Sequence, residues 1–451
     1  MYREQDLRFL QDIYDRQSND IALLYGRRSC GLSDIITDFV RGKHCLYYRA
    51  GSVRDTTQKE LFAGEIYDQT RSLIFPGEDY EKMMTTYINE LGDEKVVIIF
   101  DDFQYLVRDN HTLINLLSNI LYKGCRPGSA LFLLASDDIR WVENDMIRLV
   151  GRRSSEISGV IKVNEIAPAE FMRLFPKIPA AEAISVYSFL GGKGALYNDL
   201  TGKTTVKDVV TDYLRRWSDI YFDSNSFLPK DIREPSVYNS ILVYLASGVN
   251  KLNDIHKKMG IDRAKLSVYL KTLCQYQIVE KAATSIYVIN DRTILFYYRF
   301  VFCHISSLSL LGPERFYKKY IEKNISVFAE EVYPLFCMDH VRMLAEKDML
   351  SFKMAGVEKY YDKEGAIDFI ITAAGGNIIA CTCRLSQPAM NHNTYDIVKA
   401  SIRKNRLECE NIWLFSEPGF DQKLTSMSKT TEGLYLIDTN AFKGFVDTSG
   451  L

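Results

Sequence analysis

The amino-acid sequence predicts an α/β protein, with a helix-covered parallel sheet first, helical segments after it and a second α/β region toward the C-terminus. Two observations predict this class. Up to about residue 165, short continuous apolar runs alternate with amphipathic stretches, which is typical of parallel strands buried on both faces. From about residue 326 onward, the sequence returns to a mixture of strand and helix patterns. At 451 residues the chain is also too long for one ordinary core, so we expect several domains.

The predicted elements follow in order along the chain. Apolar runs predict four strands in the first region: Ile21–Tyr25, Cys45–Tyr48, Val96–Phe100 and Leu131–Ala135. The pattern is then helical up to about residue 232. Three helices and a hairpin are predicted at Tyr238–Ser247, Val249–Met259, Asp262–Tyr276, Ile278–Lys281 and Ser285–Ile289. After an aromatic helical connector, the last strands are expected near Ala366–Thr372, Asn377–Cys383 and Ile412–Phe415. These patterns predict domains over residues 1–165, 166–232, 233–290, 291–325 and 326–451.

Composition narrows the class of protein. The chain is 47% hydrophobic and 25% charged, with a net charge of -2, so any nucleic-acid surface must be a local basic patch. Its polar N-terminus is unlike a signal peptide, and no apolar run approaches the ~20 residues that span a bilayer. Nine scattered cysteines fit a reducing compartment. We therefore expect a cytoplasmic protein without a membrane partner.

A glycine-bracketed loop follows the first predicted strand. It reads Gly26-Arg27-Arg28-Ser29-Cys30-Gly31-Leu32-Ser33 and precedes a predicted helix at Asp34–Val40. This is the frame G-x-x-x-x-G-K-[ST], in which backbone N–H groups and a helix dipole hold phosphates. Ser33 stands where a hydroxyl holds Mg²⁺, whereas Leu32 stands where a lysine normally reaches the β- and γ-phosphates. Taken alone, the octapeptide favours an ordinary turn between a strand and a helix.

Two further strand ends change this interpretation. The apolar run Val96–Phe100 is followed by Asp101 and Asp102, as in strands whose first acid supports Mg²⁺ and whose second acid orients the attacking water. The strand Leu131–Ala135 ends at Ser136-Asp137, where a sensor residue lies in such a fold. Because the three elements occur in the correct order, the sequence predicts a phosphate-binding α/β fold.

Several strings extend the argument to most of the chain. Leu24-Tyr25-Gly26-Arg27-Arg28 and Asp101-Asp102-Phe103-Gln104-Tyr105-Leu106 resemble segments of the archaeal-type P-loop ATPases, which are relatives of the AAA and STAND classes. Gly151-Arg152-Arg153 resembles the Gly-Arg-Arg segment of that family. Phe189-Leu190-Gly191-Gly192-Lys193-Gly194 resembles its helical-lid signature, which normally reads Gly-Gly-x-Pro.

This resemblance implies ATP and Mg²⁺ as cofactors, bound by the loop residues 26–33. It implies that Ser33 and Asp101 hold the metal, that Asp102 positions water and that Arg152 stabilises the γ-phosphate. Leu32 departs from the family, since leucine carries no charge, although Arg27 or Arg28 could compensate in part. We therefore expect weak or absent hydrolysis.

The predicted three-helix segment resembles the winged helix-turn-helix of the same family. Between residues 248 and 285 it carries seven Lys or Arg against three Asp or Glu. Arg263, Lys265, Ser267 and Lys271 lie on its third helix, where a recognition helix meets double-stranded DNA. Alternatively, the module packs against the ATPase core or a protein partner.

The C-terminal region resembles a restriction-endonuclease-like fold, whose metal site reads Asp…Glu-x-Lys. Here Asp368 supplies the first acid, while Thr382 and Arg384 replace the glutamate and the lysine. Arginine stays protonated and threonine is a poor Mg²⁺ ligand, so we expect no nuclease activity. The leading interpretation is a nucleotide-binding, DNA-associated regulator. The alternative is a nucleotide-independent DNA-binding or scaffold protein with an inactive ATPase fold.

Overall fold

The structure, a computed structural model, describes residues 3–16, 18–27, 29–75, 77–92, 94–109, 130–146, 148, 156–218, 223–229, 232–361 and 365–438. The chain divides into two compact units. The first comprises residues 1–165 with 193–196, and the second comprises residues 166–192 with 197–451. The short segment 193–196 therefore belongs with the N-terminal residues, although the residues on either side of it belong to the other unit.

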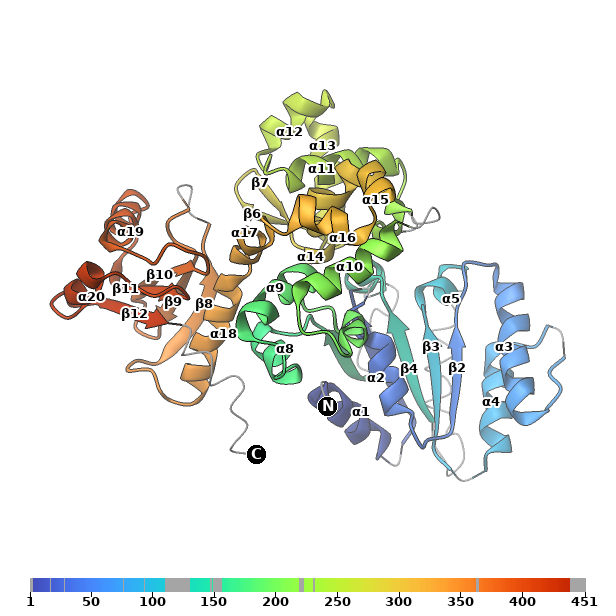
Figure 1. Cartoon of the computed structure of the whole chain (residues 1–451). Helices are drawn as coiled ribbons and strands as arrows, with labels where there is room; N and C mark the ends of the chain where they lie inside the picture. The colour runs from blue at the N-terminus through green and yellow to red at the C-terminus, as the bar shows by residue number, and fades with distance from the viewer. Residues whose placement is uncertain are drawn as a thin grey trace. The chain divides into compact units, whose positions relative to one another are not determined.

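A five-stranded sheet forms the centre of the first unit (Figure 1). Its strands lie in the order β2-β3-β4-β1-β5, and every neighbouring pair is parallel. They are β1 Asp20–Gly26, β2 Cys45–Arg49, β3 Val96–Asp101, β4 Ala130–Ser136 and β5 Ile157–Val163. The predicted α/β class and its four apolar strands are confirmed. The prediction missed β5 because polar residues interrupt the apolar pattern of this edge strand.

Helices cover both faces of this sheet. On one face, α1 Glu4–Tyr14 and α2 Leu32–Phe39 pack against alternate residues of the strands. On the other face lie α3 Asp55–Thr70 and α4 Tyr80–Glu90. The short helix α5 Gln104–Asp109 follows β3 on this second face. Because each strand sends successive side chains to opposite faces, the continuous apolar runs fill two separate cores.

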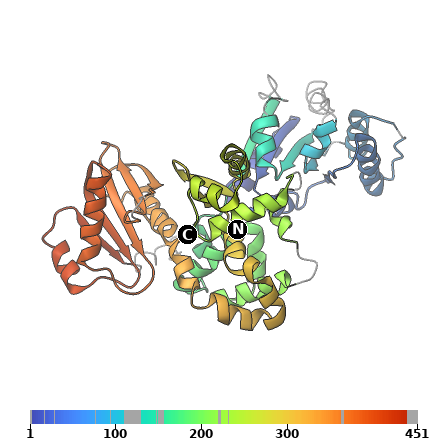
Figure 2. The same ribbon diagram turned by 90° about the horizontal axis from the view of Figure 1, so that it is seen from above.

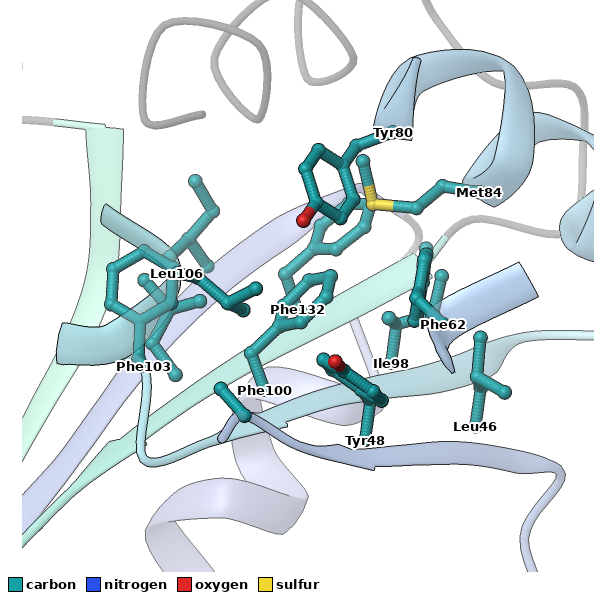
Figure 3. Close-up of a cluster of buried hydrophobic side chains, with 14 of the residues drawn as sticks. Leu46, Tyr48, Phe62, Tyr80, Met84, Ile98, Phe100, Phe103, Leu106 and Phe132 are labelled. Carbon is teal, nitrogen blue, oxygen red and sulfur yellow. The ribbon is translucent and has the colours of Figure 1, made fainter. Parts of the chain in front are cut away.

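Aromatic side chains dominate the second of these cores (Figure 3). Phe62 of α3 packs against Phe100 of β3, with ring centroids 5.4 Å apart, and against Tyr48 at 5.3 Å. Phe103, at the end of β3, continues the cluster. This packing fixes the strand end that carries the two acids, because Phe100 and Phe103 flank them and are fully buried.

The second unit opens with helices packed around α9 Ala180–Leu190, namely α8 Pro168–Leu174, α10 Val206–Trp217, α14 Arg292–Phe296 and α17 Ile325–Glu330. Phe189 lies at the centre of this group, and its ring centroid is 4.5 Å from that of Phe296. Shorter turns connect these helices: η3 Gly194–Leu200, η4 Ser224–Phe227, η5 Tyr297–Val301, η6 Phe302–His304, α15 Ile305–Leu311, α16 Pro313–Phe316 and η7 Tyr317–Ile321.

The stretch Arg292–Leu311 is long and apolar enough to cross a membrane by length and composition alone, and 44% of its most apolar window is buried in the molecule. The stretch lies in the predicted aromatic helical connector, and the expectation that no apolar run approaches the length of a membrane span is wrong for it by length and composition. Its aromatic residues are packed inside the second unit, as Phe296 is against Phe328 of α17 with ring centroids 5.5 Å apart. Such packing is that of a core helix.

Three helices and a hairpin form the next part of the second unit. They are α11 Pro235–Ala246, α12 Leu252–Met259, α13 Arg263–Gln275 and the antiparallel pair β6 Val279–Ala283 and β7 Ile286–Ile289. Each lies within a few residues of its predicted position. The expected N-cap of α13 is present, because the Asp262 carboxylate accepts hydrogen bonds from the backbone N–H groups of Ala264 and Lys265.

The last part of the second unit, coloured orange to red in Figure 2, contains a mixed sheet. Its five strands lie in the order β12-β11-β10-β9-β8. Its strands are β8 Met354–Lys359, β9 Phe369–Ala373, β10 Ile378–Arg384, β11 Cys409–Ser416 and β12 Leu434–Asp438. Helices α18 Tyr333–Glu346, α19 His392–Lys404 and α20 Gln422–Ser428 pack against it. Strands β9, β10 and β11 are the three that the sequence predicted, whereas β8 and β12 at the edges were missed.

Candidate functional site

Those predicted site residues of the first unit that the structure describes lie at the carboxyl edge of its parallel sheet. Leu24 of β1 pairs with Ala135 of β4, and Phe100 of β3 pairs with Leu134. The loop after β1, the acids after β3 and Ser136 on β4 therefore leave the sheet at the same level. In open parallel sheets, ligands bind beyond the carboxyl ends of the strands.

The loop after β1 is held in a shape suited to an anion. Ser29 and Gly31 have positive φ angles of 68° and 103°, and alternation with left-handed residues turns successive backbone N–H groups toward one concavity. The carbonyl oxygens of the loop are held from outside it. Arg3 Nη2 donates to the Cys30 oxygen at 2.8 Å, and the Ala195 N–H donates to the Ser29 oxygen at 3.1 Å.

These contacts set the direction of the neighbouring N–H groups. In a trans peptide the N–H points opposite to the C=O, so fixing the Cys30 carbonyl toward Arg3 directs the Gly31 N–H the other way. Ser33 is exposed in the first turn of α2, one residue after Leu32. The backbone frame that the sequence predicted for residues 26–33 is thus compatible with phosphate binding.

Leu32 belongs to the hydrophobic core rather than to a polar pocket. Its side chain is 9% exposed and packs in the cluster that includes Cys30, Ile35 and Ile36. A Cβ built on Gly26 would lie 3.2 Å from Leu32 Cδ1 and 2.5 Å from the Val163 oxygen. The leucine therefore closes against the first glycine of the loop, and it brings no charge to the loop.

The arginine that was expected to compensate for Leu32 is already engaged. Arg27 Nη1 lies 2.6 Å from Glu165 Oε1, and the Arg27 side chain is 10% exposed. Its charge is offset by this carboxylate, which makes it a poorer substitute for a lysine than the sequence suggested. Arg28, the other expected substitute, and Arg152, the expected γ-phosphate contact, lie outside the described residues.

Cys30 contributes its backbone to the loop while its side chain is buried. Burial raises the pKa of the Cys30 thiol to about 11, and Glu165 acts in the same direction. Arg27, Lys193 and Arg3 oppose this rise in the pKa. The thiol is therefore protonated at neutral pH, and three cationic side chains lie close enough to act on it.

The two acids at the carboxyl end of β3 are held by residues of β2. Tyr47 Oη donates to Asp101 Oδ2 at 2.6 Å, and Arg49 Nε donates to Asp102 Oδ2 at 2.9 Å. Arg49 Nε also lies 3.8 Å from Asp101 Oδ2. Burial, followed by this hydrogen bond, raises the pKa of Tyr47, so its hydroxyl stays a donor. A cation of the chain thus stands beside both predicted catalytic carboxylates.

A hydrogen-bonded chain connects the second acid to β4. Asp102 adopts a positive φ of 53°, and its Oδ1 accepts from Gln104 Nε2 at 3.3 Å. Gln104 Oε1 in turn accepts from Ser136 Oγ at 2.7 Å. Ser136 is fully buried. The sensor-like position at the end of β4 is therefore coupled to Asp102 through one glutamine side chain.

In the second unit, the four residues predicted to contact DNA lie on α13. Arg263, Lys265 and Lys271 are exposed, whereas Ser267 is half-buried and its hydroxyl donates to the Arg263 oxygen at 2.9 Å. Lys265 Nζ lies 3.7 Å from Glu234 Oε1. Three of the four residues are thus presented on the surface of the helix, and Lys265 is partly neutralised.

The predicted remnants of a nuclease site are occupied by structural hydrogen bonds. Thr382 Oγ1 donates to the Ala366 oxygen at 2.6 Å, and Asp368 Oδ2 accepts from the Cys383 N–H at 2.7 Å. Throughout the described part of the chain, no group of three or more His, Cys, Asp or Glu residues is placed to hold a metal ion.

Sequence reasoning missed Arg3, Arg49 and Lys193 as residues of the site. Arg49 carried one usable signal, because it ends a strand whose carboxyl end lies at the same edge as the acids. Lys193 lies in the segment that resembles the helical-lid signature, which indicated the segment but not a contact with the loop. Arg3 carried no signal, because no motif includes it.

Comparisons with known proteins extend these observations. Residues 1–197 match a family described as an ATPase domain predominantly from Archaea, and residues 297–397 match archaeal and bacterial proteins of unknown function. An uncharacterised protein of Methanocaldococcus jannaschii is 22% identical over 378 residues, covering 82% of this chain and 83% of that protein.

About two thirds of the chain is similar to solved structures. The Walker-type ATPase of Pyrococcus abyssi is 16% identical, with a TM-score of 0.50, over 66% of this chain and 95% of that protein. The ORC2 protein of Aeropyrum pernix, solved as ADPNP–ADP complexes, is 12% identical, with a TM-score of 0.45, over 69% of this chain and 95% of that protein.

Proposed function

Since residues 1–197 belong to the archaeal-type P-loop ATPases, we propose that the chain binds ATP and ADP at the loop after β1 and hydrolyses ATP weakly or not at all. The observation that supports binding is the retained loop backbone, with left-handed Ser29 and Gly31 and with its carbonyls held from outside. A protein that binds both nucleotides without fast turnover acts as a nucleotide-dependent switch.

The loss of hydrolysis has two physical causes. Leu32 brings an apolar side chain where charge on the β- and γ-phosphates must be balanced. Asp102, the expected water-positioning acid, has its carboxylate bonded to Arg49 and Gln104. A carboxylate that is already bonded to a guanidinium is a weaker acceptor for a water proton.

Mg²⁺ fits the residues at the loop and the first acid. The hydroxyl of Ser33 and the carboxylate of Asp101 are oxygen donors of the kind that Mg²⁺ prefers, and Mg²⁺ sites usually include few protein ligands beside phosphates and water. When bound, Mg²⁺ would neutralise phosphate charge. Asp101 also accepts from Tyr47, so its carboxylate is oriented by the protein.

Calorimetric titration with Mg-ATP and Mg-ADP, beside an ATP turnover assay, tests this function. We expect micromolar binding of both nucleotides and little turnover. Gly31→Ala should weaken binding, because alanine disfavours the φ of 103° that the loop requires. Gly42→Ala is the matched control, since Gly42 has a φ of 76° and open space around it, on a turn outside the loop. Equal loss in both variants, or no binding by the native protein, would contradict the proposal.

A second candidate function, binding of double-stranded DNA by the second unit, is supported by α13. Its exposed face carries Arg263 and Lys271, and Val268 between them is 62% exposed. Exposed cations contact phosphates, and an exposed apolar side chain on a recognition helix can contact a thymine methyl group. We propose that α11–α13 with the β6–β7 hairpin form a winged helix-turn-helix that uses this face.

A DNA-binding assay over a salt series tests this second function. Affinity should fall as salt rises, and Arg263→Ala or Lys271→Ala should each reduce the salt slope by about 1. Lys347→Ala removes another exposed lysine elsewhere in the unit and should leave the slope unchanged. Salt-independent or absent DNA binding would favour a protein partner instead. Mg²⁺-dependent plasmid cleavage that Asp368→Ala abolishes would overturn our expectation that the C-terminal domain is inactive as a nuclease.

If the titration shows no nucleotide binding while DNA binding persists, the alternative holds, and the chain is a nucleotide-independent DNA-binding or scaffold protein. In that case Leu32→Lys should acquire nucleotide binding only if the loop backbone is intact.

A further inference from the structure

We propose that Tyr47 makes the nucleotide site prefer Mg²⁺ over Ca²⁺, because its hydroxyl occupies one oxygen of the Asp101 carboxylate. This inference rests on the proposed nucleotide binding and adds the metal preference of that site. Tyr47 acts through Asp101 and is therefore a positioning residue rather than a metal ligand.

The alternation of side chains along β2 places Tyr47 beside the first acid. Strand β2 pairs in parallel with β3, and Arg49 lies opposite Asp101. Residues two apart on a strand share a face, so Tyr47 and Arg49 point to one side of the sheet while Tyr48 points to the other. Tyr48 is accordingly buried in the aromatic core, whereas Tyr47 is 38% exposed and bonds to the carboxylate at the end of β3.

The two oxygens of the Asp101 carboxylate have different surroundings. Oδ2 accepts from Tyr47 Oη at 2.6 Å and lies 3.8 Å from Arg49 Nε. Oδ1 accepts from the backbone N–H of Asp102 at 3.0 Å. A carboxylate oxygen has two acceptor positions, so Oδ1 can take a second partner. At Oδ2 a metal ion would share the oxygen with a hydroxyl proton and lie close to a guanidinium, which repels it. The carboxylate therefore offers Oδ1 to a cation.

Tyr47 orients the Asp101 carboxylate without neutralising it. A tyrosine hydroxyl is an uncharged donor, whereas the guanidinium of Arg49 forms an ion pair with Asp102 at 2.9 Å. Asp101 is also 8% exposed, and a charge that is removed from bulk water attracts an opposite charge more strongly. Of the two acids, Asp101 is therefore the one prepared for a metal ion.

One open oxygen favours the smaller of the two common divalent cations. Ca²⁺ takes about six to eight oxygen ligands, and carboxylates often bind it through both oxygens. Mg²⁺ requires a near-octahedral arrangement, keeps several waters and is held by one or two carboxylates beside phosphates. Restricting a carboxylate to one oxygen removes a ligand that Ca²⁺ could use and none that Mg²⁺ needs. The Tyr47 hydroxyl therefore shifts the preference toward Mg²⁺.

Titration of ADP into the native chain and Tyr47→Phe tests the inference, with Mg²⁺, with Ca²⁺ and with a chelator in place of either ion. The native chain should bind ADP more tightly with Mg²⁺ than with Ca²⁺. Tyr47→Phe keeps the ring and frees Oδ2. The ratio of the ADP Kd in Ca²⁺ to the ADP Kd in Mg²⁺ should therefore fall about two- to tenfold, which corresponds to one hydrogen bond. ADP affinity with the chelator should be unchanged.

Tyr48→Phe is the matched control, because it removes the same hydroxyl from the neighbouring residue of the same strand. The Tyr48 hydroxyl donates to Gln58 Oε1 in the buried core. Its loss should leave the ratio of the two Kd values unchanged even if the melting temperature falls. Asp101→Asn should weaken ADP binding with either metal ion and leave it unchanged with the chelator. If Asp101→Asn bound ADP as tightly as the native chain with Mg²⁺, Asp101 would not hold the metal and the inference would be wrong.

The outcomes separate this inference from the proposed function. The same ratio in Tyr47→Phe and the native chain, or no preference for Mg²⁺ in the native chain, would overturn the inference and leave nucleotide binding intact. An equal loss of ADP affinity in all three conditions would give Tyr47 a structural role alone and would also overturn it. No ADP binding by the native chain in any condition would overturn both. If Tyr47→Phe does not fold, an unchanged ratio in Tyr47→Met would overturn the inference.

Discussion

Replacing Leu32 with lysine tests both the packing and the chemistry of the loop. Leu32 is 9% exposed and lies among Cys30, Ile35 and Ile36. Burying a leucine side chain contributes about 1.5–3 kcal/mol. A lysine keeps part of this through its stem, but its ammonium would join Lys193, one of the cations already beside Cys30. Without nucleotide, we expect Leu32→Lys to lose about 2 kcal/mol of stability.

Ligand binding should offset this loss. For a unit of this size, about 2 kcal/mol corresponds to a fall of roughly 4–8 °C in the melting temperature. ADP at a hundred times its Kd adds about 2.7 kcal/mol to the stability of the folded state. Leu32→Lys should therefore recover with ADP at least the stability that it lost.

The assay is thermal unfolding with and without ADP, for the native chain, Leu32→Lys and Leu32→Met. Leu32→Met conserves the side-chain volume and should lower the free energy of unfolding by less than about 1.5 kcal/mol. Its nucleotide affinity should equal that of the native chain. If Leu32→Lys without nucleotide were as stable as the native chain, the leucine would not be part of the core. If one fixed ADP concentration stabilised Leu32→Lys no more than Leu32→Met, a lysine at this position would not reach phosphate.

Three further outcomes follow from the structure. Arg49→Ala should tighten Mg-ATP binding by up to about fivefold, because it removes the ion pairs with the two acids, and an exposed ion pair contributes about 0.2–1 kcal/mol. Calorimetry would measure this affinity, with Arg54→Ala as the control. Weaker Mg-ATP binding by Arg49→Ala would mean that Arg49 itself contacts phosphate. Ser136→Ala should destabilise the first unit by about 1–3 kcal/mol in urea unfolding, since it leaves the buried Gln104 oxygen without its hydrogen bond. An unchanged urea midpoint would show that this hydrogen bond does not contribute to stability. Burial lowers the pKa of His340 to about 4, so on acidification this histidine is protonated in the unfolded chain before it is protonated in the folded chain. The free energy of unfolding that is present above pH 6.5 should therefore fall as the pH drops toward 4, by on the order of 3 kcal/mol at most. A His340→Gln variant should show a smaller loss between pH 7 and 5, and an identical profile would contradict this assignment.

The sequence determined the strands and the loop because these features are local. Four short apolar runs alternating with helical patterns predicted strands, and the glycine frame between β1 and α2 predicted the position of the phosphate loop. The edge strands β5 and β8 were not predicted because polar residues or glycine interrupt their apolar pattern, whereas the edge strand β2 was predicted from the apolar run Cys45–Tyr48. The edge strand β12 was also not predicted, although its first four residues are apolar. The acids Asp101 and Asp102 were visible for the same local reason, at the end of an apolar run.

Only the tertiary structure decided which residues meet at the site. Arg49 reaches the acids because the order β2-β3-β4-β1-β5 makes β2 the neighbour of β3, although about fifty residues separate Arg49 from Asp102. Lys193 reaches the loop because the chain returns from the helical segment to the sheet. Hydrophobic periodicity indicates which residues are buried. It does not indicate which charged residues far apart in the sequence become neighbours, because the crossover connections between strands decide that.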